Sequence, residues 1–179
     1  YGDLTTREIW AELDKILSQT FTHPMAGTMA IAAACMDSGG HHTQRVLEWT
    51  AARHHRRIYA TKGASRAGLA AWPHRPSFSK TGKLPVYVIG VDALKEVVFA
   101  RLAKAEAGPG FCHAPAGREP AWFAELVAEK PFTTYSKGRA TREWRKKDRD
   151  RNEAFDCRVY AAAALEALKI GGFNVDAEA

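Results

Sequence analysis

Apolar residues recur at two different spacings along this chain, and the alternation between them predicts a mixture of helices and strands. A helical period runs through residues 7–21, where the apolar positions are Ile9, Leu13, Ile16, Leu17 and Phe21. Thr5 or Thr6 is placed to cap the first turn, and Pro24 follows the last. The first element is therefore expected to be an amphipathic helix.

An unbroken apolar run, TMAIAAACM, occupies residues 28–36 and stops at Asp37, Ser38 and two glycines. Such a run is typical of a strand that is covered on both faces of its sheet. Alanine is a poor strand former, which leaves a helix as the alternative. The glycines that end the run favour the strand.

The rest of the chain continues the alternation. We expect helices at residues 43–54, 93–104, 121–130 and 152–168, strands at 56–64 and 85–92, a possible edge strand at 111–115, and a hairpin over 132–144 that turns near Lys137 and Gly138. Residues 65–84 are rich in Pro, Ser, Lys and Arg and are expected to form a loop. Asp92 is placed to cap the helix that follows it. This order predicts an α/β domain with a mixed sheet flanked by helices, ending in a hairpin and a helix.

Size and composition narrow the class of protein without naming a function. The 179 residues suit one domain, and the formal net charge of +6 favours a polyanionic partner. No apolar run approaches the roughly 20 residues that cross a bilayer, so no membrane partner is expected. The three cysteines, Cys35, Cys112 and Cys157, are far apart and form no CxxC pair, which indicates buried free thiols.

Three carboxylates stand at positions where chemistry can occur. Asp37 comes at the carboxyl end of the predicted buried strand, which is the edge of an open α/β sheet where ligands bind; it could instead only cap the following turn. Glu153 and Asp156 are three residues apart in the last helix, so they share one face within about 5 to 6 Å. Like charges that close are tolerated in water, or when a cation lies between them.

The residues before this acidic pair are strongly basic. Oxygen ligands from one or two carboxylates suit Mg²⁺ or Mn²⁺, and two such ions can activate water and stabilise the leaving oxygen of a phosphodiester. We therefore expect Asp37, Glu153 and Asp156 to hold one or two of these ions. The expected phosphate contacts are Lys62, Arg142, Arg145, Lys146, Lys147, Arg149 and Arg151. Trp144 either stacks on a base or belongs to the core.

Several segments occur in an order that resembles a known family. They are MDSGGHHTQRVLEW, KGAS, YVIGVDALKEVVFARL, GPGFCHAP, KGRATREWRKK and RNEAFDCRVYAAAALE. Together they resemble the nuclease domain of the lambda-type terminase large subunits of tailed bacteriophages and prophages, from about residue 1 to 170.

The resemblance implies an RNase H-like fold over 1–179 and metal-dependent cutting of concatemeric DNA during genome packaging. Asp37, Glu153 and Asp156 match the family's acids, and Asp92 matches another family Asp that either binds metal or caps its helix. The implied partners are double-stranded DNA, the terminase small subunit and the portal or procapsid, in the cytoplasm of the bacterial host.

The resemblance also implies parts that this sequence lacks. The family's domain begins with strands upstream of residue 1, the first of which carries another metal-binding Asp, and no GxxxxGK[ST] motif of a packaging ATPase occurs. The chain is thus expected to be truncated at its N-terminus. Two alternatives stay open: a catalytically incomplete fragment that binds DNA or assembles without cutting, and another RNase H-like nuclease of resolvase or integrase type.

Overall fold

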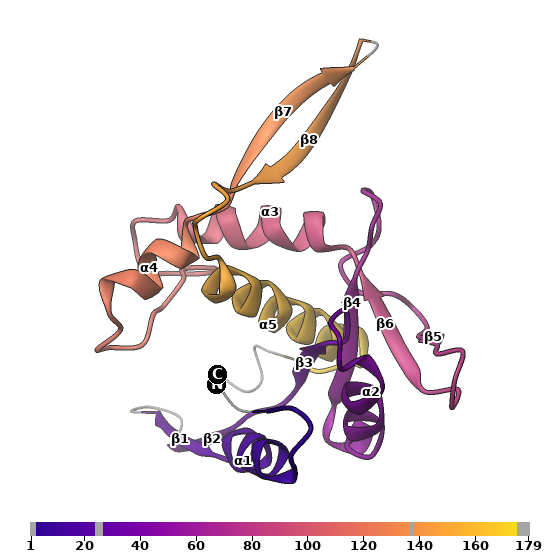
Figure 1. Ribbon diagram of the computed structural model, residues 1–179. Coiled ribbons are helices and arrows are strands. Elements are labelled where there is room, and N and C mark those ends of the chain that lie inside the picture. Colours follow the sequence, from indigo (N-terminus) through magenta and orange to yellow (C-terminus); the bar gives the residue numbers. More distant parts are fainter. Residues whose placement is uncertain (1–2, 24–26, 137, 175–179) are drawn as a thin grey trace.

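The computed structural model describes residues 3–23, 27–136 and 138–174. Its helices are α1 (Arg7–Leu17), α2 (Thr43–Ala51), the short 3₁₀ helix η1 (His54–Arg56), α3 (Val91–Leu102), α4 (Pro120–Leu126) and α5 (Glu153–Ile170). Its strands are β1 (Thr20–His23), β2 (Gly27–Ala30), β3 (Ala34–Asp37), β4 (Ile58–Gly63), β5 (Ser77–Phe78), β6 (Pro85–Ile89), β7 (Lys130–Ser136) and β8 (Arg139–Arg145). Figure 1 shows their arrangement.

A four-stranded mixed sheet forms the centre of the molecule, in the order β3-β4-β6-β5. β3 pairs parallel to β4, and β4 parallel to β6, so these three strands end at the same edge. β5 pairs antiparallel to β6. The predicted α/β class with a mixed sheet is confirmed, and the architecture agrees with the RNase H-like fold that the resemblance implies.

Helices cover both faces of this sheet. Successive residues of a strand point to opposite sides, and here both sides carry apolar residues that pack against helices. Cys35 and Tyr87 pack into a cluster with Leu94 of α3 and Phe155 of α5. Their neighbours Met36 and Val86 join a second cluster on the other face, built on Trp10 of α1 and on Val46 and Leu47 of α2. Val46 and Leu47 are both buried there.

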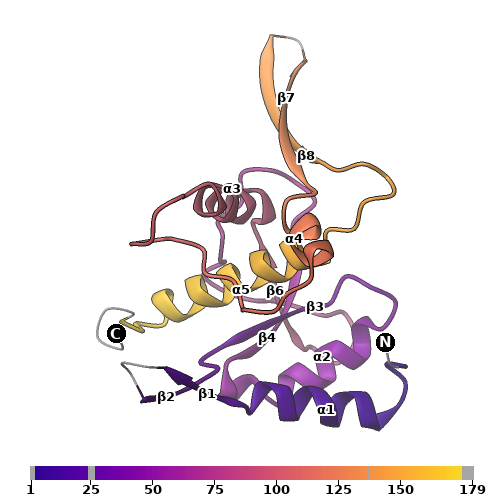
Figure 2. The ribbon, with the colours of Figure 1, turned by 90° about the vertical axis from the view of Figure 1, so that its left-hand side faces the viewer.

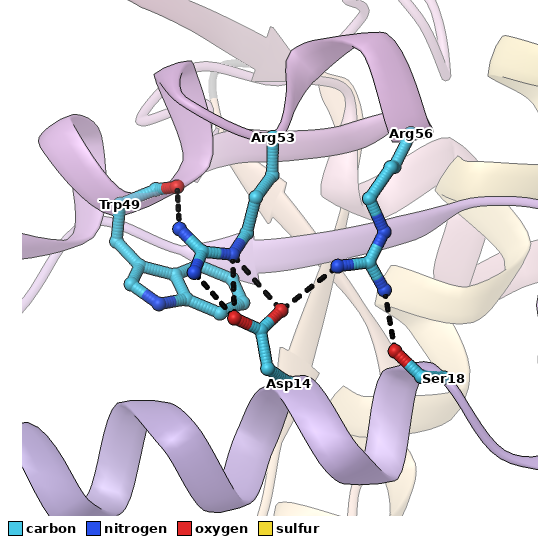
Figure 3. A network of polar contacts seen from close by, with 5 residues as sticks. All are labelled: Asp14, Ser18, Trp49, Arg53 and Arg56. Atoms are coloured by element: carbon cyan, nitrogen blue, oxygen red, sulfur yellow. Dashed lines mark hydrogen bonds and ion pairs between the residues drawn. The ribbon is translucent and has the colours of Figure 1, made fainter.

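An ion-pair network fastens α1 to the end of α2 and to η1 (Figure 3). Asp14 accepts hydrogen bonds from Arg53 Nε at 2.9 and 3.0 Å and from Arg56 Nη1 at 2.9 Å. The Arg53 guanidinium also lies 4.0 Å from the centroid of the Trp49 ring. These arginines therefore have a structural role, and the Arg53 and Arg56 charges lower the pKa of Asp14.

The β7–β8 hairpin projects from the body of the protein (Figures 1 and 2). Its register runs from Lys130 opposite Arg145 to Ser136 opposite Arg139. The hairpin is confirmed, although Lys137 of the predicted turn lies outside the described residues. At its base Trp144 packs 5.7 Å from Phe99 and 5.9 Å from Phe155 between ring centroids. Trp144 thus belongs to the core, as one of the two readings expected.

Two predictions for the N-terminal third are wrong in detail. The first helix ends at Leu17, and Phe21 lies in β1, since the β-branched and aromatic residues of TFTH favour a strand. The apolar run 28–36 is divided between β2, which pairs with β1, and β3, which enters the central sheet. Residues 31–33, between these two strands, belong to neither; the run is rich in alanine, which is a poor strand former. Every residue of β2 is exposed.

Three further predictions need correction. Asp92 does not cap α3: the helix begins at Val91 and Gly90 occupies the N-cap. Residues 111–115 form no strand, and Phe111 instead lines a small cavity against α3 and α5. The three free thiols are less buried than expected: Cys35 and Cys112 are half-buried, and Cys157 is exposed. In the part of the chain that the structure describes, no helix is long and apolar enough to cross a membrane.

Candidate active site

Asp37 stands at the carboxyl end of β3, at the edge where the three parallel strands stop. Its side chain is exposed, and its Oδ1 accepts a hydrogen bond from the Gly39 N–H at 2.9 Å. Ser38 is buried, and its hydroxyl donates to the Thr61 carbonyl of β4 at 2.8 Å. The carboxylate therefore caps its own turn, at the sheet edge where the sequence predicted it.

The first turn of α5 brings Glu153 and Asp156 to the same place. Phe155 and Val159 are buried in the core, and this anchors the helix against the sheet. A cavity of about 680 Å³ lies between β3 and α5, and Asp37, Glu153 and Asp156 all line it. The structure thus brings together the three acids that the sequence singled out, from segments more than a hundred residues apart.

The negative charges of this cavity act on one another. Burial raises the pKa of Asp156, and the charges of Glu129, Glu153 and Asp37 raise it further, while Lys95 opposes them. The pKa of Glu153 is lowered instead, by the backbone N–H groups at the start of α5 and by a hydrogen bond from Arg151. Glu153 is thus stabilised as an anion, whereas the surroundings of Asp156 disfavour its ionised form.

A polar network behind Asp156 was not anticipated from the sequence. Lys95 of α3 donates to Glu129 Oε1 at 2.6 Å, and both side chains are nearly buried, with 12% and 8% exposed. Asn152 Nδ2 lies 3.2 Å from Glu129 Oε2 and 3.1 Å from Asp156 Oδ2. This chain of contacts orients Asp156. Only the spacing of Asn152 and Asp156, four apart on a helix, was a signal in the sequence.

Tyr160 provides a similar contact for Asp37. It lies one turn beyond Asp156 on α5 and lines the same cavity. Burial raises the pKa of its hydroxyl, and so do the charge of Asp37 and their hydrogen bond. The hydroxyl therefore stays protonated and donates to the carboxylate, which joins the sheet edge to α5 through a polar contact.

The donor set suits a divalent cation held by a pair of carboxylates rather than one surrounded by protein ligands. Within residues 3–23, 27–136 and 138–174, no three His, Cys, Asp or Glu side chains are grouped so that they could hold a metal ion. Asp37 and Asp156 nevertheless lie near enough for one charge to shift the pKa of the other. Mg²⁺ commonly binds one or two carboxylates and completes its shell with water and substrate phosphate.

Two of the predicted site residues lie away from the cavity wall. Asp92 is exposed in the first turn of α3, and the cavity is lined on that side by Val91. Lys62 is exposed near the carboxyl end of β4, the neighbour of β3.

The predicted phosphate contacts divide into paired and unpaired side chains. Arg142 pairs with Glu96, Arg145 with Glu143, and Arg151 with both Glu125 and Glu153. Lys146 donates to the Asp150 carbonyl at 2.6 Å. The side chains of Lys147 and Arg149 are exposed and have no ion pair or hydrogen bond with another described residue. These two are the most available to an incoming phosphate.

Comparisons with known proteins identify the family to which this chain belongs. It matches the family described as "Terminase large subunit gpA, endonuclease domain" over residues 1–176. It is 33% identical over 180 residues to the terminase, large subunit, of Escherichia phage lambda, covering 93% of this chain and 27% of that protein. It is 30% identical over 169 residues to the terminase, large subunit, of Enterobacteria phage P21, covering 88% of this chain and 26% of that protein. The chain therefore spans about a quarter of each relative's length. No solved structure matches it.

Proposed function

Because the chain belongs to the endonuclease-domain family of the terminase large subunit gpA, we propose that it is a divalent-metal-dependent DNA endonuclease that cuts concatemeric viral DNA during genome packaging. The observation that carries the proposal is the single cavity lined by Asp37, Glu153 and Asp156. The terminase small subunit and the portal or procapsid are its proposed partners, in the cytoplasm of the bacterial host.

In this proposal Asp37 and Asp156 bind one or two Mg²⁺ or Mn²⁺ ions, with Glu153 at the rim of the cavity. The bound cation supplies electrostatic stabilisation of the charge that develops on the phosphodiester oxygens. Tyr160 holds Asp37 through its hydroxyl, and Asn152 holds Asp156 through its amide. Both carboxylates are thereby presented in fixed orientations, which lowers the cost of ordering them when substrate binds.

The basic segment, residues 145–151, supports the choice of DNA as substrate. It leads directly into the first turn of α5, so a phosphate backbone held there passes beside the acids. Contacts of this kind are to phosphate and carry little sequence information. Lys147 and Arg149 bind backbone phosphates in this arrangement, and their contribution falls as salt rises.

Plasmid nicking tests the proposal. Supercoiled plasmid is incubated with the chain and Mn²⁺, beside Asp37→Asn, Asp156→Asn, an EDTA control, and Glu106→Gln as a matched substitution of an exposed acid outside the cavity. Metal-dependent nicking that both Asn variants abolish and Glu106→Gln retains supports the proposal. Nicking that survives in both Asn variants overturns it.

A second candidate function is binding without cutting. It is favoured by the finding that no three potential ligands are grouped among the described residues. A protein of this kind shifts plasmid on a gel at low salt and leaves it supercoiled with every metal. The same experiment therefore separates the two functions.

A further inference from the structure

A second groove lies beside the acidic cavity, between α4 and α5. Its volume is about 640 Å³, and three residues of α5, Glu153, Cys157 and Ala161, line both spaces. These positions are four apart, so they form one row along the helix. The groove is therefore the continuation of the acidic cavity across α5.

The side chains of the groove are unlike those of the cavity. Three arginines line it, Arg118, Arg151 and Arg158, against two carboxylates, Glu125 and Glu153. Arg151 already pairs with both of these acids. Neither the Arg118 nor the Arg158 side chain has an ion pair or hydrogen bond with another residue of the described ranges, so among these residues the two guanidinium groups have no counter-ion.

An aromatic ring completes the groove. Trp122 of α4 is half-buried, and the Arg118 guanidinium lies 5.6 Å from the centroid of its ring. Arginine beside an aromatic ring is the combination by which proteins hold a single strand, because the cation binds phosphate and the ring stacks on a base. A base inside a duplex is already stacked on its neighbours and is not free for such a contact.

We propose that this groove binds a short unpaired stretch of DNA adjoining the phosphodiester that is cut, with Arg118 and Arg158 on phosphates and Trp122 on a base. The inference rests on the proposed endonuclease function and adds to it a subsite for a single strand. It also assigns a role to three residues outside the acidic cavity and outside the basic segment. Arg151 lines the groove and pairs with Glu153, which lines both spaces.

Binding of a labelled oligothymidylate tests the groove without requiring cleavage. The probe is about ten nucleotides long, within the span of known single-strand sites, and every register on it is equivalent. Affinity is measured by fluorescence anisotropy at several salt concentrations, with EDTA present so that no cutting occurs. Arg118→Gln and Arg158→Gln are each expected to reduce the slope of log affinity against log salt by about 0.7, the value of one phosphate contact on a single strand.

Trp122→Ala is expected to weaken binding about tenfold and to leave the salt slope unchanged, because stacking involves no counter-ion release. Trp122→Phe keeps a ring and is expected to restore most of the affinity, which a merely misfolded groove would not show. The matched controls are Arg75→Gln, an exposed loop arginine, and Phe78→Ala, a residue 63% exposed on β5. Both controls are expected to bind like wild type.

Equal affinity and equal salt slope for the groove variants and the controls would overturn the proposal. If all three groove variants nick plasmid normally and bind the probe as well as wild type, the single-strand subsite is refuted and the endonuclease function is not. A chain that binds the probe through these residues but never nicks plasmid refutes the endonuclease function, and with it the placement of the strand beside a cut. Preference for duplex over single strand, unchanged by Trp122→Ala, also contradicts the assignment.

Discussion

Replacing Lys95 by methionine tests the network that holds Asp156. Methionine keeps an unbranched apolar stem of similar length and removes only the ammonium, so packing against α5 is largely preserved. Lys95 Nζ lies 2.6 Å from Glu129 Oε1, and the two side chains are only 12% and 8% exposed. The substitution leaves Glu129 nearly buried without its counter-ion, with Asp156 close by through Asn152.

The expected loss of stability follows from this geometry. Two unit charges at 2.6 Å attract by about 6 kcal/mol at an effective dielectric constant of about 20. Desolvation of both groups opposes that attraction, and breaking a buried pair by removing one partner costs about 3–5 kcal/mol. We therefore expect Lys95→Met to lower the free energy of unfolding by about 3 kcal/mol or more.

Urea unfolding followed by tryptophan fluorescence measures this loss, since Lys95 lies 6.0 Å from the Trp144 ring. The matched control is Lys15→Met, which breaks a pair at 3.1 Å whose side chains are 74% and 62% exposed; it should cost below about 1 kcal/mol. The double variant Lys95→Met/Glu129→Gln removes both charges and keeps an acceptor for Asn152, so most of the lost stability should return.

The reasoning is refuted if Lys95→Met is no more costly than Lys15→Met, or if the double variant is as unstable as the single one. A second readout is the pH dependence of nicking. Lys95 lowers the pKa of Asp156, so its removal should move the acid limb of the activity profile to higher pH. Lys15→Met should leave that limb in place.

Three further outcomes are expected. Asp156→Asn should raise the midpoint of thermal unfolding at pH 7, because the raised pKa of Asp156 makes its ionisation unfavourable in the folded state. The stability that the protonated carboxyl contributes is complete below its ordinary pKa of 3.8 and is lost as pH rises through the raised pKa. The gain from the substitution should therefore vanish below about pH 3.8. Asp14→Asn should cost about 1–3 kcal/mol, measured by urea unfolding at neutral pH; because the pKa of Asp14 is lowered by Arg53, the cost should shrink as pH falls through that pKa. Gly90→Ala should cost about 3 kcal/mol or prevent folding, since a Cβ would lie 2.1 Å from the Leu69 carbonyl oxygen, and circular dichroism with thermal melting checks it.

The candidate acids were predictable because their signals are local. Asp37 follows an apolar run that stops at glycines, and Glu153 and Asp156 share the first turn of a strongly apolar helix. Such periodicities indicate which face of an element is buried and where the element ends. They were sufficient to single out three acids that line the cavity, although they could not show that these acids come together.

The network behind the acids had no comparable signal. Lys95 and Glu129 are 34 residues apart and belong to separate elements, and each reads in the sequence as an ordinary surface charge. The same holds for Arg118, Trp122 and Arg158, which meet only because α4 lies beside α5. Conversely, Arg142 and Arg145 were predicted to contact phosphate, and the sequence did not show that the fold pairs them with Glu96 and Glu143.

The sequence by itself determined most of the helices and strands from Thr43 onward, the mixed α/β class, and the closing hairpin and helix, and it singled out three candidate acids. It missed β5, which lies in the predicted loop, and it placed a strand at 111–115 where there is none. It failed where an alanine-rich run left β2 and β3 undecided, because such a run has no strong preference. Only the tertiary structure decided that the end of β3 faces the first turn of α5, and that Lys95, Asn152 and Tyr160 hold the acids there. Local periodicity specifies which face of each element is buried, whereas the partner of that face depends on how the elements pack together.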